Sequence, residues 1–99
     1  MGKYLFLWEI DQSKIPMDPK ERADGYLVLL SLIRQDFEKG RLTDWGTFVG
    51  ETNGYAVAEG SEVEIGLFVN QYIPVVIFKA YPAAAIDQIE ELLKIMSGR

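Results

Sequence analysis

The sequence predicts an α+β domain built around an antiparallel sheet, and three observations support this fold class. An Asn-Gly pair between Trp45 and Glu59 is flanked by β-rich runs, which is the strongest short-range signal for a hairpin. Two capped amphipathic segments lie between the apolar runs and are typical of helices. The first run is apolar on both faces, which indicates a strand that needs cover on each side.

The first strand is expected over residues 4–10, with the sequence YLFLWEI. Tyr4, Phe6 and Trp8 alternate with Leu5 and Leu7, so both faces are apolar and the strand should be central in the sheet. The loop over residues 11–17 is long for a strand-to-helix connection. It is interpreted either as a lid over a pocket or as a plain surface connection.

A helix should begin after Asp18, which is a good N-cap, with Pro19 at its first position and Glu21 at its third. Gly40 is a good residue to end it. The helix carries one apolar stripe, formed by Tyr26, Leu29, Leu30, Ile33 and Phe37.

The hairpin turn is expected at Asn53 and Gly54, because a type I′ turn requires positive φ at both central residues. This register makes Thr52 face Tyr55, Glu51 face Ala56, Gly50 face Val57 and Val49 face Ala58. One face of the hairpin then carries Trp45, Thr47, Val49, Ala56 and Ala58, and the other carries Phe48, Tyr55 and Val57.

A short second helix should follow Ser61, because Ser61 and Glu64 form a capping box. The last strand is expected over residues 72–81, with Pro74 near its start, as an edge strand tolerates, and Pro82 ending it. A third helix is expected over residues 83–96. Its apolar face consists of Ile86, Ile89, Leu92, Leu93 and Met96.

The expected order is strand, helix, strand, strand, helix, strand and a final helix. The first six elements form the split βαβ pattern of the ferredoxin-like fold, as a single domain over residues 1–99 with strand order 4-1-3-2. Right-handed crossovers place the first two helices on one face of the sheet. The other face remains open unless a second copy of the chain or the third helix covers it.

The composition excludes several classes of chemistry. The chain has no Cys and no His, which excludes disulfides, thiolate nucleophiles, Cys/His zinc sites and Ser-His-Asp triads. The net charge of −5 argues against a nucleic-acid partner. No membrane span or signal peptide is recognised, so a cytoplasmic location is expected. No cofactor is predicted. The acidic stretch between Arg41 and Lys79 either serves solubility or attracts cations or a basic partner.

Three segments together resemble the dimeric α+β barrel superfamily, and most of all its small families of unknown function. They are the first strand YLFLWEI, the hairpin WGTFVGETNGYAVAEG leading into a short helix, and the closing run VVIFKAYP. The resemblance covers nearly the whole chain and implies two ferredoxin-like sheets that pack face to face around a small pocket. It implies no single activity, since the superfamily includes cofactor-free monooxygenases, lactone isomerases, haem enzymes and binding domains. The haem branches need a His ligand, which this chain lacks.

The expected topology gathers candidate ligand-binding residues at one end of the sheet. A Lys and a Glu beside aromatic side chains are suited to a polar aromatic or planar ligand, and burial would shift their pKa values toward acid–base work. The alternative is that the charged residues are exposed while the aromatic ones simply pack. The group consists of Tyr4, Trp45, Glu59, Lys79 and Tyr81, and Trp8 is added as a candidate beside the long loop.

No catalytic residue and no metal ligand is assigned. Glu9, Asp11 and Glu51 have carboxylates suited to a hard cation, but their spacing matches no known loop motif. The favoured interpretation is a cytoplasmic homodimer that binds a small, partly apolar molecule between the sheet and the partner, with or without cofactor-free catalysis. The alternative is a structural or ligand-sensing interaction domain.

Two features of the structure should separate these functions. A cavity with polar groups from Tyr4, Glu59 or Lys79 favours binding. A barrel centre filled by Phe6, Trp8 and Phe48 favours the structural role.

Overall fold

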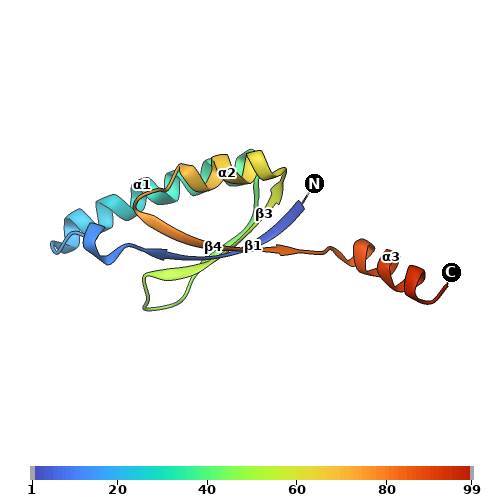
Figure 1. Cartoon of the computed structure of the whole chain (residues 1–99). Coiled ribbons are helices and arrows are strands. Elements are labelled where there is room, and N and C mark those ends of the chain that lie inside the picture. The colour runs from blue at the N-terminus through green and yellow to red at the C-terminus, as the bar shows by residue number, and fades with distance from the viewer. Residues whose placement is uncertain (1, 99) are drawn as a thin grey trace.

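A four-stranded antiparallel sheet carries two helices on one face, and a third helix lies apart from the sheet and from these two helices (Figure 1). The computed structural model describes residues 2–98. Its elements are β1 (Gly2–Ile10), a 3₁₀ turn (Gln12–Lys14), α1 (Pro19–Glu38), β2 (Leu42–Thr47), β3 (Asn53–Gly60), α2 (Glu62–Asn70), β4 (Val76–Ala83) and α3 (Ile86–Met96). This order confirms the one expected from the sequence.

The strands lie in the order β2-β3-β1-β4, which confirms the predicted 4-1-3-2 arrangement. Strand β1 is central, since Leu7 pairs with Tyr55 on β3 and with Lys79 on β4. Strands β2 and β4 are the edges of the sheet. Helices α1 and α2 both cover the same face, as right-handed crossovers require.

The predicted helix caps are confirmed. The Asp18 side chain accepts a hydrogen bond from the Glu21 backbone N–H at 3.0 Å, and Pro19 opens α1. Ser61 and Glu64 form the reciprocal bonds of a capping box at the start of α2. Gly40 follows α1 with φ +75°, a conformation that L side chains rarely adopt.

The predicted turn at Asn53-Gly54 is wrong. Both residues lie in β3, and the chain reverses through residues 48–52, where Gly50 has φ +80°. Trp45 therefore pairs with Ala56, and the predicted register is shifted. Gly54 is needed for close packing, because a Cβ there would run into the Gly46 carbonyl oxygen and the Trp8 ring. The observed register still places Trp45 on the same sheet face as Ala56 and Ala58.

The last strand and the third helix begin later than predicted. Strand β4 covers Val76–Ala83 and continues through Pro82, while α3 begins at Ile86. Pro82 does not end the strand, because β4 is an edge strand that pairs only with β1 and so tolerates a missing N–H donor.

The core lies between the sheet and the helices α1 and α2. Phe6 and Trp8 of β1 face it, and α2 contributes Ile65 and Phe68. The Phe6 ring is fully buried and lies 5.6 Å from the Phe68 ring and 5.8 Å from the Phe78 ring, measured between centroids. Aromatic packing therefore fixes α2 over the centre of the sheet.

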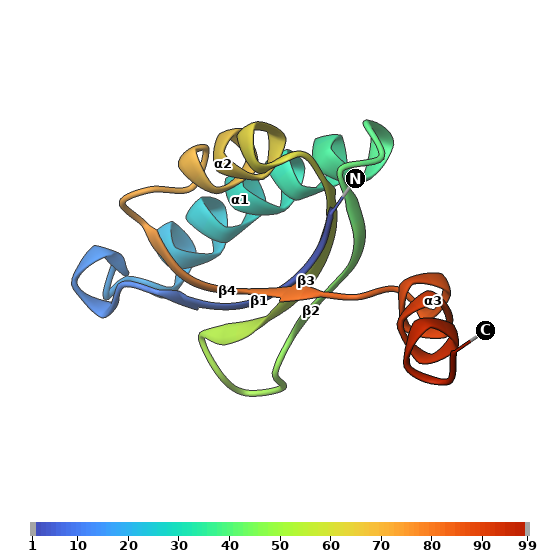
Figure 2. The ribbon, with the colours of Figure 1, turned by 45° about the vertical axis from the view of Figure 1, so that its right-hand side comes forward.

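The opposite face of the sheet is open. Leu5, Leu7, Ile77 and Tyr81 point to it from β1 and β4, and each is exposed. Helix α3 does not fold across this face but extends beyond the end of β4, as two views show (Figure 1 and Figure 2). The predicted extra helix exists, and within residues 2–98 it leaves the open face uncovered.

Candidate functional site

The inner face of β3 leaves room beneath the helices, because it carries only small residues. Gly54, Ala56, Ala58 and Gly60 all point toward the helices and are buried. The large aromatic side chains of β1 fill part of the space above them. The part that stays empty lies between α1 and the sheet.

This space is a half-open cavity of about 180 Å³, with the exposed residues Leu30, Thr47 and Glu51 in its wall. Its wall is mainly aliphatic and aromatic, and its polar atoms come from two tyrosines, two threonines and one glutamate. The lining residues are Trp8, Ile10, Tyr26, Leu29, Leu30, Ile33, Trp45, Thr47, Glu51, Thr52, Ala56, Phe68, Tyr72, Val76 and Phe78. A mostly apolar wall with a few polar groups is the usual character of a small-molecule site.

Two stacked tryptophans form one wall of the cavity. The rings of Trp8 and Trp45 lie 5.4 Å apart between centroids and only 6° from parallel. The Trp8 indole N–H donates to the Tyr55 backbone carbonyl at 3.0 Å, so the polar edge of that ring is satisfied. The pair therefore presents a flat apolar surface that suits another planar group.

Tyr26 contributes a polar group that no other residue within residues 2–98 satisfies. Its hydroxyl is buried, and within residues 2–98 it has no hydrogen-bond partner. A buried hydroxyl without a partner destabilises a protein by roughly 1–3 kcal/mol, so such groups are rare. Tyr26 lines the cavity from α1, where a bound molecule with a polar atom can complete its hydrogen bonding.

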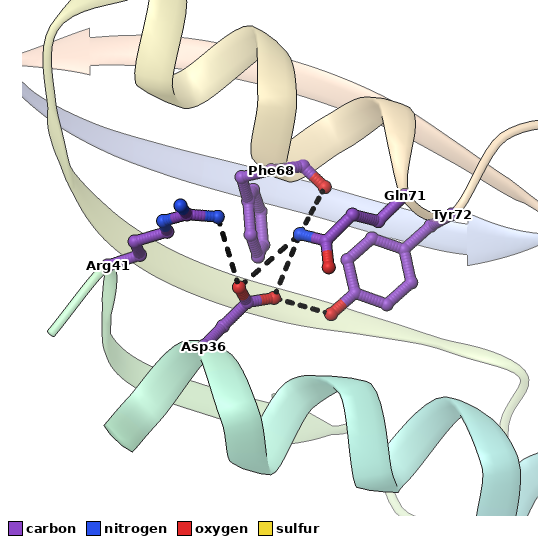
Figure 3. Close-up of polar contacts among 5 residues, drawn as sticks. All are labelled: Asp36, Arg41, Phe68, Gln71 and Tyr72. Carbon is purple, nitrogen blue, oxygen red and sulfur yellow. Dashed lines mark hydrogen bonds and ion pairs between the residues drawn. The ribbon is translucent and has the colours of Figure 1, made fainter. Parts of the chain in front are cut away.

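A buried carboxylate holds the other tyrosine of the cavity in place (Figure 3). Asp36 is fully buried and accepts a hydrogen bond from the Tyr72 hydroxyl at 2.7 Å. The Gln71 side-chain amide donates to both carboxylate oxygens at 3.3 and 3.4 Å, and Arg41 Nη1 lies 3.9 Å from Oδ1. The cluster joins the end of α1 to the end of α2.

The Asp36 contact also decides what Tyr72 can do chemically. Burial and the neighbouring carboxylate of Asp36 raise the pKa of Tyr72 far above its ordinary value. Tyr72 therefore stays protonated at neutral pH, and its O–H donates a hydrogen bond to Asp36. Its oxygen can still accept a hydrogen bond from a ligand, but it is no general base.

The six ligand-binding residues predicted from the sequence do not form one site. The sheet separates them: Tyr4, Trp8 and Trp45 face the helices, whereas Glu59, Lys79 and Tyr81 belong to the open face. Neighbouring residues of one strand point to opposite faces, so strand ends that meet need not share a face. Only Trp8 and Trp45 line the cavity.

The two features proposed to separate binding from a structural role do not apply as expected. The cavity takes its polar groups from Tyr26, Tyr72, Thr47, Thr52 and Glu51, and not from Tyr4, Glu59 or Lys79. Phe6 and Trp8 lie under the helices, while Phe48 follows β2 and is exposed.

A smaller hollow of about 160 Å³ lies on the open side of the sheet. Leu7, Ile77 and Lys79 contribute to it, as do Phe48 and Glu9.

The loop over residues 11–17, which was predicted as a possible lid, forms no part of the cavity wall. Its Gln12 amide donates to the Thr52 hydroxyl at 2.7 Å, and Thr52 does line the cavity.

The predicted cation site included Asp11. Asp11 accepts two hydrogen bonds from Ser13, which hold its carboxylate and lower its pKa. Across residues 2–98, no three Asp or Glu side chains come together in a way that could hold a metal ion.

Sequence reasoning assigned no role to three residues of this region: Tyr26, Asp36 and Tyr72. Tyr26 was placed in the apolar stripe of the first helix, and Tyr72 at the start of the last strand. The sequence does contain a signal for Asp36, because this residue lies three positions after Ile33 on the helix face that the apolar stripe buries. A carboxylate on a buried helix face requires partners, and that rule points to this cluster.

Comparisons with known proteins identify no family. The chain matches no protein-family model, and no curated protein is significantly similar to it. The likeness to dimeric α+β barrel proteins therefore remains a prediction. Of the helices within residues 2–98, none combines the length and the apolar character needed to cross a membrane.

Proposed function

We propose that this protein binds a small, planar and largely apolar molecule in the cavity between α1 and the sheet. One observation carries the proposal: the stacked pair Trp8 and Trp45 lines the same cavity as Tyr26, whose buried hydroxyl has no partner within residues 2–98. The indole surface favours a flat ring, and the hydroxyl favours a polar substituent on that ring.

The size of the cavity suits a ligand of one or two rings. Its volume of about 180 Å³ is close to that of engineered apolar cavities of about 150 Å³, which bind benzene. The ligand class is therefore a phenol, an indole or a similar compound with one hydrogen-bonding group. This site lies inside one chain, on the opposite side of the sheet from the pocket expected between two copies.

We further propose that the protein works as a homodimer of the α+β barrel type. The open face of the sheet presents Leu5, Leu7, Ile77 and Tyr81. Leu5 pairs directly with Tyr81, while Lys79 faces Leu7 and Glu9 faces Ile77. Exposed apolar side chains gathered on one face, with charged residues among them, mark interaction sites in soluble proteins. A second copy of the same chain is a partner that is present wherever the protein itself is.

A fluorescence titration tests ligand binding, because both tryptophans of the chain line the cavity. Phenol and toluene are titrated separately against the full-length protein. We expect both to change the tryptophan emission and phenol to bind at least several-fold more tightly, since only phenol can pair with Tyr26. The variant Tyr26→Phe should bind the two compounds equally well.

The control variant is Tyr4→Phe, which removes a hydroxyl from the same sheet face outside the cavity wall and should retain the preference for phenol. If neither compound alters the emission of the folded protein, the cavity is no binding site. That result would favour a structural interaction domain.

A further inference from the structure

Helix α3 carries an apolar stripe that no other part of residues 2–98 covers. Both views place the helix beyond the end of β4, away from the sheet and from α1 and α2 (Figure 1 and Figure 2). The radius of gyration of the chain is 16.5 Å, whereas a compact domain of this length has about 13 Å. The stripe consists of Ile86, Ile89, Leu92, Leu93 and Met96, which are 41–75% exposed.

A helix of this length needs a packing partner. Helix α3 has 11 residues, and isolated helices shorter than about 12–15 residues are marginal in water. Most of the stability of such a helix comes from burying its apolar face. The sequence of α3 therefore implies a surface on which the stripe lies.

The chain's own open sheet face is poorly placed to be that surface. Only Ala84 and Ala85 separate the end of β4 from α3. The segment from Pro82 to Ala85 contains no glycine, and in it no residue has positive φ. It therefore continues the direction of β4 and carries α3 outward instead of turning it back over the sheet.

The open sheet face has the complementary character. Leu5 pairs with Val57 on one side and with Tyr81 on the other, and Leu7 lies two residues along the same face. Lys79, next to Leu7, has no carboxylate within ion-pair distance in residues 2–98. A helix of 11 residues is about 16 Å long, so it fits on strands that extend for about 30 Å.

We propose that α3 of each copy packs its apolar stripe on the open sheet face of a second copy, in a symmetric exchange. Glu90 lies four residues after Ile86 and three before Leu93, so it borders the stripe. Its carboxylate suits Lys79, which has no ion-pair partner within residues 2–98. A twofold exchange covers both helices and both sheet faces at once and leaves no free site for a third copy. The inference rests on the proposed homodimer but not on the proposed ligand.

Light scattering of the full chain over a concentration series tests the exchange with three variants. Leu93→Glu places a charge in the stripe, and Leu7→Glu places one on the open sheet face. Ile95→Glu is the matched control, because Ile95 is exposed on the same helix but lies outside the stripe. We expect the wild type and Ile95→Glu to be dimers and the other two variants to dissociate at least tenfold more readily.

Mixing the two weakened variants identifies the occupant of the sheet face. Leu93→Glu keeps an intact sheet and Leu7→Glu keeps an intact helix, so a mixed dimer has one undamaged contact between helix and sheet. We expect the mixture to dimerise at a concentration where each variant alone is monomeric. No recovery would overturn the exchange, because α3 would then pack on another α3 or on its own sheet.

The remaining outcomes separate the two proposals. A dimer that survives Leu93→Glu would overturn the role of α3 but keep the homodimer. A monomeric wild type would overturn both. Circular dichroism checks that each variant folds, and phenol binding inside each chain should persist in every variant.

Discussion

The rings of Trp8 and Trp45 stack nearly parallel, with their centroids 5.4 Å apart and 6° between their planes. The contact joins the central strand β1 to the edge strand β2 across β3, where the small residue Ala56 leaves the space for it. The same geometry gives the cavity its flat wall. Fold stability and the proposed ligand binding therefore depend on the same pair.

Replacing Trp45 with leucine should lower the free energy of unfolding by about 1 kcal/mol, because an aromatic pair contributes roughly this amount beyond its buried area. Urea unfolding measures the change, and phenol binding should weaken in the same variant. The comparison is Phe48→Leu, which breaks the looser and more exposed stack of Phe48 on Tyr55. Equal losses in the two variants would contradict a special role for the tryptophan pair.

Tyr26→Phe should make the ligand-free protein more stable by about 1 kcal/mol. The substitution removes a buried hydroxyl that has no partner in residues 2–98, and with it the desolvation penalty of that group. Thermal unfolding without added ligand gives the measurement. A variant less stable than the wild type would show that the hydroxyl is already paired in the free protein.

Tyr72→Phe should have the opposite sign, with a loss of about 2 kcal/mol, because the Tyr72 hydroxyl donates to the buried carboxylate of Asp36. The loss should also depend on pH. The raised pKa of Tyr72 means that the folded state holds this proton more tightly than the unfolded chain does. The stabilisation is therefore complete below the ordinary tyrosine pKa of about 10 and declines as the pH rises above it.

Urea unfolding of the wild type and Tyr72→Phe between pH 7 and pH 11 tests this dependence. The difference in stability should be constant up to about pH 9 and then shrink. Tyr55→Phe is the control, because the pKa of Tyr55 is also raised, by its hydrogen bond to Asp44, but at an exposed position. A difference that grows with pH would contradict the proposed contact.

Gly54→Ala should destabilise the fold by about 2 kcal/mol. A Cβ at this position would meet the Gly46 carbonyl oxygen and come within 2.6 Å of the Trp8 ring, so strand or ring must shift. Gly25→Ala is the matched control, since nothing lies within 4 Å of a Cβ there. In the helix α1 the control should be neutral or stabilise by up to about 1 kcal/mol. Equal stability of the two variants would show that β2 and β3 pair in another register.

The sequence was sufficient to predict the elements, the helix caps and the strand order, because these depend on local signals. Asp18 with Glu21 and Ser61 with Glu64 cap the helices they were expected to cap. The strand order follows from the order of the elements and the handedness of their connections. None of these predictions requires knowing which residues face one another.

The turn and the site could not be predicted for the same reason. Asn53-Gly54 is a strong turn signal, but in this fold Gly54 serves the close approach of Trp8 and Gly46, which is a contact across three strands. Strand ends that meet can also have side chains on opposite faces, which separated Tyr4 from Lys79. Long-range register decides both outcomes, and a single sequence carries little information about it.

A crystal structure of the protein grown with 4-bromophenol tests whether the cavity binds a phenol, because the anomalous signal of bromine locates the ligand. We expect a single strong peak in the cavity, with the ring against Trp45 and the phenol oxygen beside the Tyr26 hydroxyl. Bromine bound only on the open sheet face would contradict it. So would a ligand-free cavity in crystals where α1 has closed onto Ala56.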